Sequence, residues 1–167
     1  MEELVKELYE EWEVASYHLT EADFIRFVRD SHRALVESAR LGRIIFYGEL
    51  PVFDEIKERF SDNVAKIIGF ILGACSEYEV TKGRPLISAV VISQDTREPD
   101  GEFYGLSTVP YHLCQDVWEE PVKTPPEIVI SKRQEFWLSE LQQTLDFWGK
   151  CDTEGLPEGD TGDRITR

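Results

Sequence analysis

The sequence is poor in positive charge relative to negative charge. Its 167 residues include 18 Lys and Arg against 33 Asp and Glu, which gives a formal net charge of −15. A general nucleic-acid binder usually carries an excess of basic residues, because phosphate neutralisation supplies most of its affinity. The composition therefore disfavours that class, and we interpret the acidic surface as a source of solubility through self-repulsion.

Cysteines are few and long apolar runs are short. Three cysteines, an odd number at wide spacing, do not read as a disulfide framework, and reduced thiols predict a cytoplasmic protein. The longest apolar runs, IIGFILGAC and PLISAVVIS, are too short to cross a bilayer. The acidic first segment, MEELVKELYEEW, has neither the basic nor the apolar region of a signal peptide. We therefore expect neither a membrane span nor a signal peptide.

Motifs that carry common chemistries are also missing. His112 and Cys114 lie two positions apart, but no C-x-x-C or H-E-x-x-H motif accompanies them. The phosphate-binding patterns G-x-x-x-x-G-K-[ST] and G-x-G-x-x-G do not occur, nor does the nucleophile motif G-x-S-x-G. We therefore predict no metal site, no cofactor and no catalytic residue.

Hydrophobic residues make up 41% of the chain, enough for one globular domain, which we place at residues 1–149. Thr20 is predicted to cap a helix that ends at Gly42, and Gly83 is predicted to end a second, largely buried helix. The polar segment 150–167 is predicted to be a mobile tail. Apolar spacing predicts helices over 2–14, 21–41, 51–60, 63–80 and 131–150.

Two segments have β character. RIIFYGEL is a short run, and PLISAVVIS is a continuous apolar run that predicts a central strand with Val90 and Val91 buried. The following QDTREPDGEF is predicted to be a turn at the tip of a wing or hairpin. Its carboxylate pairs are interpreted as solvated rather than as acid–base pairs. These pairs are Asp95 with Glu98 and Asp100 with Glu102.

The order of elements predicts an α+β fold, mainly helical, with a winged-helix-like centre over 43–105 and a small antiparallel sheet or hairpin. The segments IIFYGEL, VAKIIGFIL and RPLISAVVIS resemble the C-terminal domain of the DNA alkyltransferase family, with its YGxLA-like, ARAVG and PCHR segments. The resemblance places Tyr47 on the family's tyrosine, Lys66 on its nucleotide-flipping arginine and Gly69 on its glycine. Where the family has its nucleophilic Cys and the adjacent His, positions 89–91 read Ala-Val-Val. Alkyl transfer needs an activated thiolate, so it is excluded.

A second resemblance covers GRPLISAVVISQDTREPDGEFYGL. This segment is similar to a group of uncharacterised microbial proteins with a GRPxLSAxVVxxxTxxPGxGFF pattern. In that group an FYGEL-like segment also comes first and an EFW helix closes the chain.

One helical face departs from the acidic character of the chain. Arginines at steps of three, four and seven share this face of the helix predicted over 21–41. They either pair with the glutamates of the first helix or contact an acidic partner or phosphates, to which the planar guanidinium is suited. These residues, the arginine strip, are Arg26, Arg29, Arg33 and Arg40.

The sequence thus favours a non-enzymatic binding or regulatory module that acts on another protein through the arginine strip. One alternative is a non-catalytic DNA or RNA binder that uses Tyr47, Lys66, Arg97 and the strip, although Lys66 is the single basic residue of the predicted recognition helix over 61–79. A second alternative is an enzyme with an unfamiliar site lined by Tyr47, Tyr104 and His112.

Overall fold

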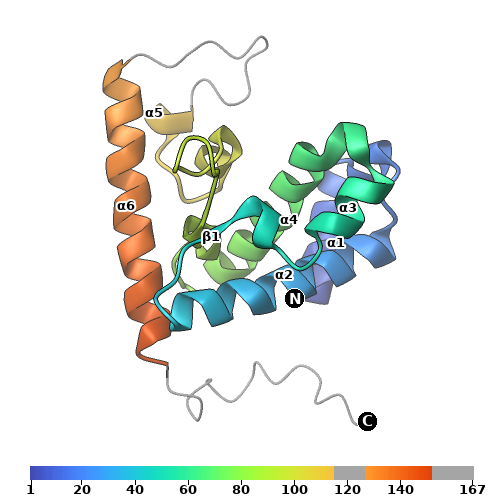
Figure 1. The fold of residues 1–167 in the computed structure, drawn as a ribbon, viewed down its shortest axis with the longest axis horizontal. Coiled ribbons are helices and arrows are strands. Elements are labelled where there is room, and N and C mark those ends of the chain that lie inside the picture. Colours follow the sequence, from blue (N-terminus) through green and yellow to red (C-terminus); the bar gives the residue numbers. More distant parts are fainter. Residues whose placement is uncertain (115–126, 152–167) are drawn as a thin grey trace.

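The computed structural model describes residues 1–114 and 127–151, and most of these are helical (Figure 1). The α-helices are α1 (Glu2–Glu11), α2 (Glu21–Arg40), α3 (Phe53–Arg59), α4 (Val64–Thr81), α5 (Tyr111–Cys114) and α6 (Glu127–Gly149). Two short strands are β1 (Ile45–Phe46) and β2 (Val91–Ile92). Short 3₁₀ turns are η1 (Val14–Tyr17), η2 (Tyr47–Glu49), η3 (Ser61–Asn63), η4 (Ile87–Val90) and η5 (Gly101–Gly105).

The core forms where α2 packs against α4. Phe24, Phe27 and Leu35 of α2 are fully buried, as are Ile67 and Ile71 of α4. Figure 1 shows α1 and α3 at one end of this pair and the long α6 along the other end. The apolar spacing in the sequence therefore predicted a mainly helical fold correctly.

The predicted start of α2 and the predicted ends of α2 and α4 are confirmed. The Thr20 side chain accepts a hydrogen bond from the Asp23 N–H at 3.2 Å, which caps the first turn of α2. Gly42 and Gly83 follow α2 and α4 with φ of +64° and +67°, a conformation that glycine adopts without a Cβ clash. After each glycine, the next N–H bonds to the carbonyl five residues back, which closes the helix end.

The predicted antiparallel sheet or hairpin is wrong. β1 and β2 pair in parallel, with Ile45 opposite Val91 and Phe46 opposite Ile92. The chain leaves β1, passes through α3 and α4, and returns to β2, and such a helical crossover brings the second strand back in the same direction. The part of the chain that the structure describes shows neither a wing nor a hairpin.

The predicted strand over 85–93 is correct in burial but largely wrong in conformation. Val90 and Val91 are fully buried, yet residues 87–90 form the turn η4 and the strand begins only at Val91. Side chains from α4 and α6 bond to this backbone in place of neighbouring strands. Ser76 Oγ accepts from the Ser88 N–H at 3.0 Å, and Trp137 Nε1 donates to the Ala89 carbonyl at 2.9 Å.

No helix in the described ranges is both long and apolar enough to span a bilayer. The predicted tail, 150–167, lies outside the described residues except for Lys150 and Cys151. Cys75 is buried and its thiol donates to the Val28 carbonyl at 3.5 Å. Burial raises the pKa of this thiol, so it stays protonated and unreactive.

Candidate functional site

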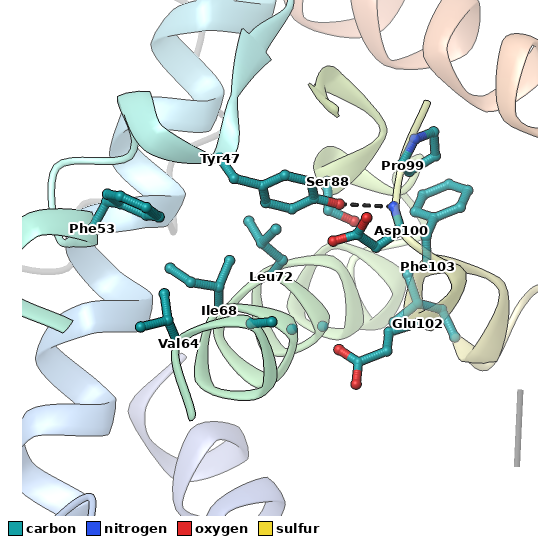
Figure 2. Close-up of a pocket in the computed structure, with 14 residues that line it drawn as sticks. Tyr47, Phe53, Val64, Ile68, Leu72, Ser88, Pro99, Asp100, Glu102 and Phe103 are labelled. Atoms are coloured by element: carbon teal, nitrogen blue, oxygen red, sulfur yellow. Dashed lines mark hydrogen bonds between the residues drawn. The ribbon is translucent and has the colours of Figure 1, made fainter. Parts of the chain in front are cut away.

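A pocket of about 300 Å³ lies between α4 and the segment that leads into η5 (Figure 2). This volume is at the lower end of the range for ligand sites in proteins. Apolar side chains form most of the lining, and Figure 2 shows those of α4 on one side and Phe103 on the other. The apolar lining residues include Phe53, Val64, Ile68, Leu72, Phe103 and Leu106.

Tyr47, the first residue of η2, crosses the pocket toward the opposite side. The Phe46 N–H donates to the Glu49 carboxylate at 2.7 Å, which turns the chain from β1 into η2 and places Tyr47 at the pocket. The Tyr47 hydroxyl accepts a hydrogen bond from the Asp100 N–H at 2.8 Å (Figure 2). This bond joins the two sides of the pocket.

A salt bridge lies at the rim of the pocket. Lys66 Nζ is 3.0 Å from Glu102 Oε1, and 5.1 Å from the centre of the Phe70 ring. The other carboxylate oxygen of Glu102 lies over Gly69, where a Cβ would be only 1.7 Å from it. The absence of a side chain at Gly69 therefore allows the salt bridge to lie directly against α4.

Burial changes the ionisation of the polar groups in the pocket. It raises the pKa of Asp100 above the usual range, while hydrogen bonding to the Tyr47 hydroxyl opposes this shift. Burial also raises the pKa of Tyr47, so its hydroxyl stays protonated. Among the described residues, no Lys or Arg forms a salt bridge with Asp100. Asp100 thus differs from Glu102, whose charge is balanced by Lys66.

The segment that carries Asp100 and Glu102 is held at both ends. Ser93 N–H donates to the Glu98 carbonyl at 2.9 Å, and the Glu98 side chain bonds to Gln134 of α6. Beyond η5, the Glu77 carboxylate of α4 accepts from both the N–H and the hydroxyl of Ser107, at 2.8 and 2.7 Å. These bonds hold the second side of the pocket in place without a ligand.

The structure brings two of the three predicted contact residues to this pocket. Tyr47 lines it, and Lys66 lies at its rim through Glu102. Arg97, with φ of +62°, places its guanidinium carbon 5.0 Å from the centre of the Phe46 ring, next to Tyr47 in the chain. Of the predicted grouping of Tyr47, Tyr104 and His112, Tyr47 lines this pocket and Tyr104 does not.

Tyr104 instead packs beneath Arg133, with 5.0 Å between the ring centre and the guanidinium carbon. Burial, followed by the nearby charge of Glu98, raises the pKa of Tyr104 to about 12. The side chain of His112 lies outside the described part of the structure.

The arginine strip divides into three environments. Arg26 binds the Glu55 carboxylate of α3 through two hydrogen bonds, at 2.9 and 2.7 Å, and also contacts Asp23. Arg40 lies against Trp148 of α6, 5.7 Å from the ring centre. Arg29 and Arg33 are exposed, with the Arg29 guanidinium 3.8 Å from Asp30. The partner that neutralises Arg26 is thus α3 rather than the first helix.

Asp100 and Glu102 were interpreted from the sequence as part of a solvated turn, and both are exposed, but they also line the pocket. No local pattern marks them, because Tyr47 lies 53 positions from Asp100 and Lys66 lies 36 positions from Glu102. The neighbouring aromatic pair at 103–104 is the one local signal that this turn packs against the core.

Comparisons with family models, with curated proteins and with solved structures find no match for the chain. The resemblances noted in the sequence therefore stay predictions. Within the described ranges, no three His, Cys, Asp or Glu side chains are grouped so that they could hold a metal ion. The fold and the pocket together define a mainly helical protein with a pocket that is lined by aliphatic and aromatic side chains and carries two carboxylates.

Proposed function

We propose that the protein is a non-enzymatic binding module whose pocket receives a side chain from a protein partner. The observation that supports this most directly is a pocket of about 300 Å³ with a preformed apolar lining and exposed residues at its mouth. A large side chain that enters such a pocket becomes desolvated, and buried anchors of this kind supply most of the affinity at protein interfaces.

The polar groups in the pocket support binding rather than catalysis. The Asp100 N–H and the Tyr47 hydroxyl are hydrogen-bonded to each other, and the Ser88 hydroxyl lies 2.7 Å from the Ser76 hydroxyl. A nucleophilic serine needs a general base beside it, and another serine hydroxyl does not supply one. Ser88 therefore lacks the arrangement of a catalytic nucleophile, which supports binding as the role of the pocket.

The proposal is tested by filling the pocket from its rim. Ala65 is exposed on α4 and lines the pocket, so Ala65→Phe places a ring across the mouth without disturbing the core. The matched control is Ala22→Phe, an exposed helical alanine of α2. Selection of a displayed peptide library on the native chain should enrich peptides that bind it. Ala65→Phe should weaken the binding of these selected peptides by roughly tenfold or more. The proposal would be contradicted if Ala65→Phe and Ala22→Phe bound the selected peptides equally well, or if the native chain enriched no peptide.

Nucleic-acid binding is a second candidate because Tyr47 and Lys66 meet at one pocket. The positive charge of Lys66 is balanced by Glu102, however, and Asp100 adds a further carboxylate that would repel phosphates. We therefore expect no gel shift of random duplex DNA with micromolar protein at physiological salt. A shift that weakens steeply as salt is added would support phosphate contacts and this second candidate.

A further inference from the structure

The two carboxylates of the pocket differ in how their charges are balanced. Glu102 pairs with Lys66 at 3.0 Å, whereas Asp100 has no salt bridge within the described residues. Figure 2 shows the Asp100 carboxyl turned toward the pocket, above Leu72 and beside the Tyr47 hydroxyl. A guest in this pocket therefore meets one uncompensated acidic group at the end of an apolar lining.

The lining suits a guest with an aliphatic stem. Val64, Ile68 and Leu72 follow one another along one face of α4, at steps of four, and lead toward Asp100 (Figure 2). The rings of Tyr47 and Phe103 stand on the other side. An alkyl chain can lie along the aliphatic residues, and a cation at its end can meet both the carboxylate and the aromatic rings.

We propose that the side chain received by the pocket is a lysine, with its stem along α4 and its ammonium group at Asp100. This inference rests on the proposed binding function and specifies the partner as a protein with an accessible lysine. The Tyr47 hydroxyl engages the backbone N–H of Asp100, and the Asp100 carboxylate stands as a single acidic group at the end of the aliphatic residues of α4, which suits the compact charge and four-carbon stem of lysine. An ammonium group needs a single point of contact.

The rim of the same pocket already holds an ammonium group in this manner. Lys66 contacts a carboxylate and lies 5.1 Å from the centre of an aromatic ring, that of Phe70. Its side chain is 39% exposed, so it can move away from Glu102 at little cost. Lys66 thus neutralises much of the negative charge of Glu102 and reduces the attraction of Glu102 for an incoming lysine.

The ionisation of the Asp100 carboxyl should be coupled to the binding of a lysine side chain. Partial burial raises the pKa of the carboxyl, and a bound cation would lower it again because it favours the charged form. Lysine binding should therefore weaken as the pH falls and Asp100 takes up a proton. Binding of a neutral side chain of similar shape should not show this dependence.

The test compares three capped tripeptides, acetyl-Gly-X-Gly-amide with X as lysine, norleucine or glutamate. Binding is followed by NMR at the backbone amides of Gly69, Gly101 and Gly105. Norleucine has a butyl side chain without the ammonium, so the difference between it and lysine reports the charge. We expect lysine to bind roughly tenfold tighter than norleucine, and glutamate to bind weakest.

Asp100→Asn should remove the preference for lysine over norleucine, and Asp95→Asn, which changes the net charge equally at an exposed position of the same segment, should retain it. Lys66→Met should increase the affinity for the lysine tripeptide by a few fold relative to Lys57→Met, an exposed control on α3.

If the norleucine tripeptide binds as well as the lysine tripeptide, or if Asp100→Asn keeps the preference for lysine, the inference is wrong while the binding function stands. If no tripeptide shifts these amides and the peptide library is not enriched, both proposals fail.

Discussion

The Tyr47 hydroxyl accepts a hydrogen bond from the Asp100 N–H at 2.8 Å and so joins two segments that are 53 residues apart. Tyr47 follows β1, and Asp100 precedes η5, so this bond crosses the pocket from one side to the other (Figure 2). It sets the position of the one pocket carboxyl that no described cation balances.

Tyr47→Phe removes this acceptor and keeps the ring. We expect the free energy of unfolding to fall by about 1 kcal/mol, the usual net value of one hydrogen bond. The pKa of Asp100 should rise further, because the Tyr47 hydroxyl is the group that lowers it. Urea denaturation and carbon NMR of the carboxyl would measure the two effects. Tyr17→Phe is the control, and an Asp100 pKa that does not rise in Tyr47→Phe would contradict this account.

Gly69 and Gly73 occupy neighbouring turns of α4, but alanine should have different effects at the two positions. At Gly69 the new Cβ meets only the flexible end of Glu102, so the gain in helix propensity offsets the lost salt bridge. Stability should stay within about 0.5 kcal/mol of the native value. At Gly73 the Cβ would lie 3.2 Å from the Trp12 ring, and crowding should cost about 1 kcal/mol net. Thermal melting, with tryptophan fluorescence as a report on Trp12, distinguishes these outcomes.

His32 and Arg84 both contact the carboxylate of Glu79, which is fully buried. His32 Nε2 lies 2.6 Å from one carboxylate oxygen, and Arg84 Nη1 lies 3.6 Å from the other. His32→Phe removes the closer partner and leaves one buried carboxylate oxygen without its hydrogen bond, which should cost about 2 kcal/mol even though Arg84 remains. Adding Glu79→Gln should recover part of this loss, since the two residues act as a pair. Additive losses in a double-mutant cycle by urea denaturation would show that the pair is not coupled.

Asp23, Arg26, Glu55 and Arg59 form an ion cluster between α2 and α3, with contacts of 2.7 to 3.0 Å. Hydrogen bonds from Arg59 and then Arg26 lower the pKa of Asp23 from 3.8 to about 2. A lowered folded-state pKa means that the stabilisation is complete above pH 3.8 and is lost as the pH falls toward 2.

Asp23→Asn should therefore cost about 1 kcal/mol near neutral pH, a value kept small because the arginines are partly exposed to solvent. The difference between the native chain and the variant should shrink as the solution is acidified toward pH 2. Denaturant unfolding at several pH values measures it. A difference that is constant through this range would mean that the cluster does not stabilise the folded state through Asp23.

The sequence by itself determined the features that depend on neighbouring residues. Thr20 at the start of α2, Gly42 and Gly83 at helix ends, and the apolar faces of α2 and α4 are local patterns, since caps and helical spacing act within one or two turns. The burial of Val90 and Val91 followed in the same way from an unbroken apolar run.

Tertiary structure alone decided the conformation of that run and the composition of the pocket. Residues 87–90 form a turn because side chains of α4 and α6 bond to their backbone, and β2 is parallel because two helices separate it from β1. Asp100 and Glu102 face a pocket because Tyr47 and Lys66, far away in the chain, pack beside them. Such contacts depend on where distant elements meet, and no local pattern of residue types encodes that meeting.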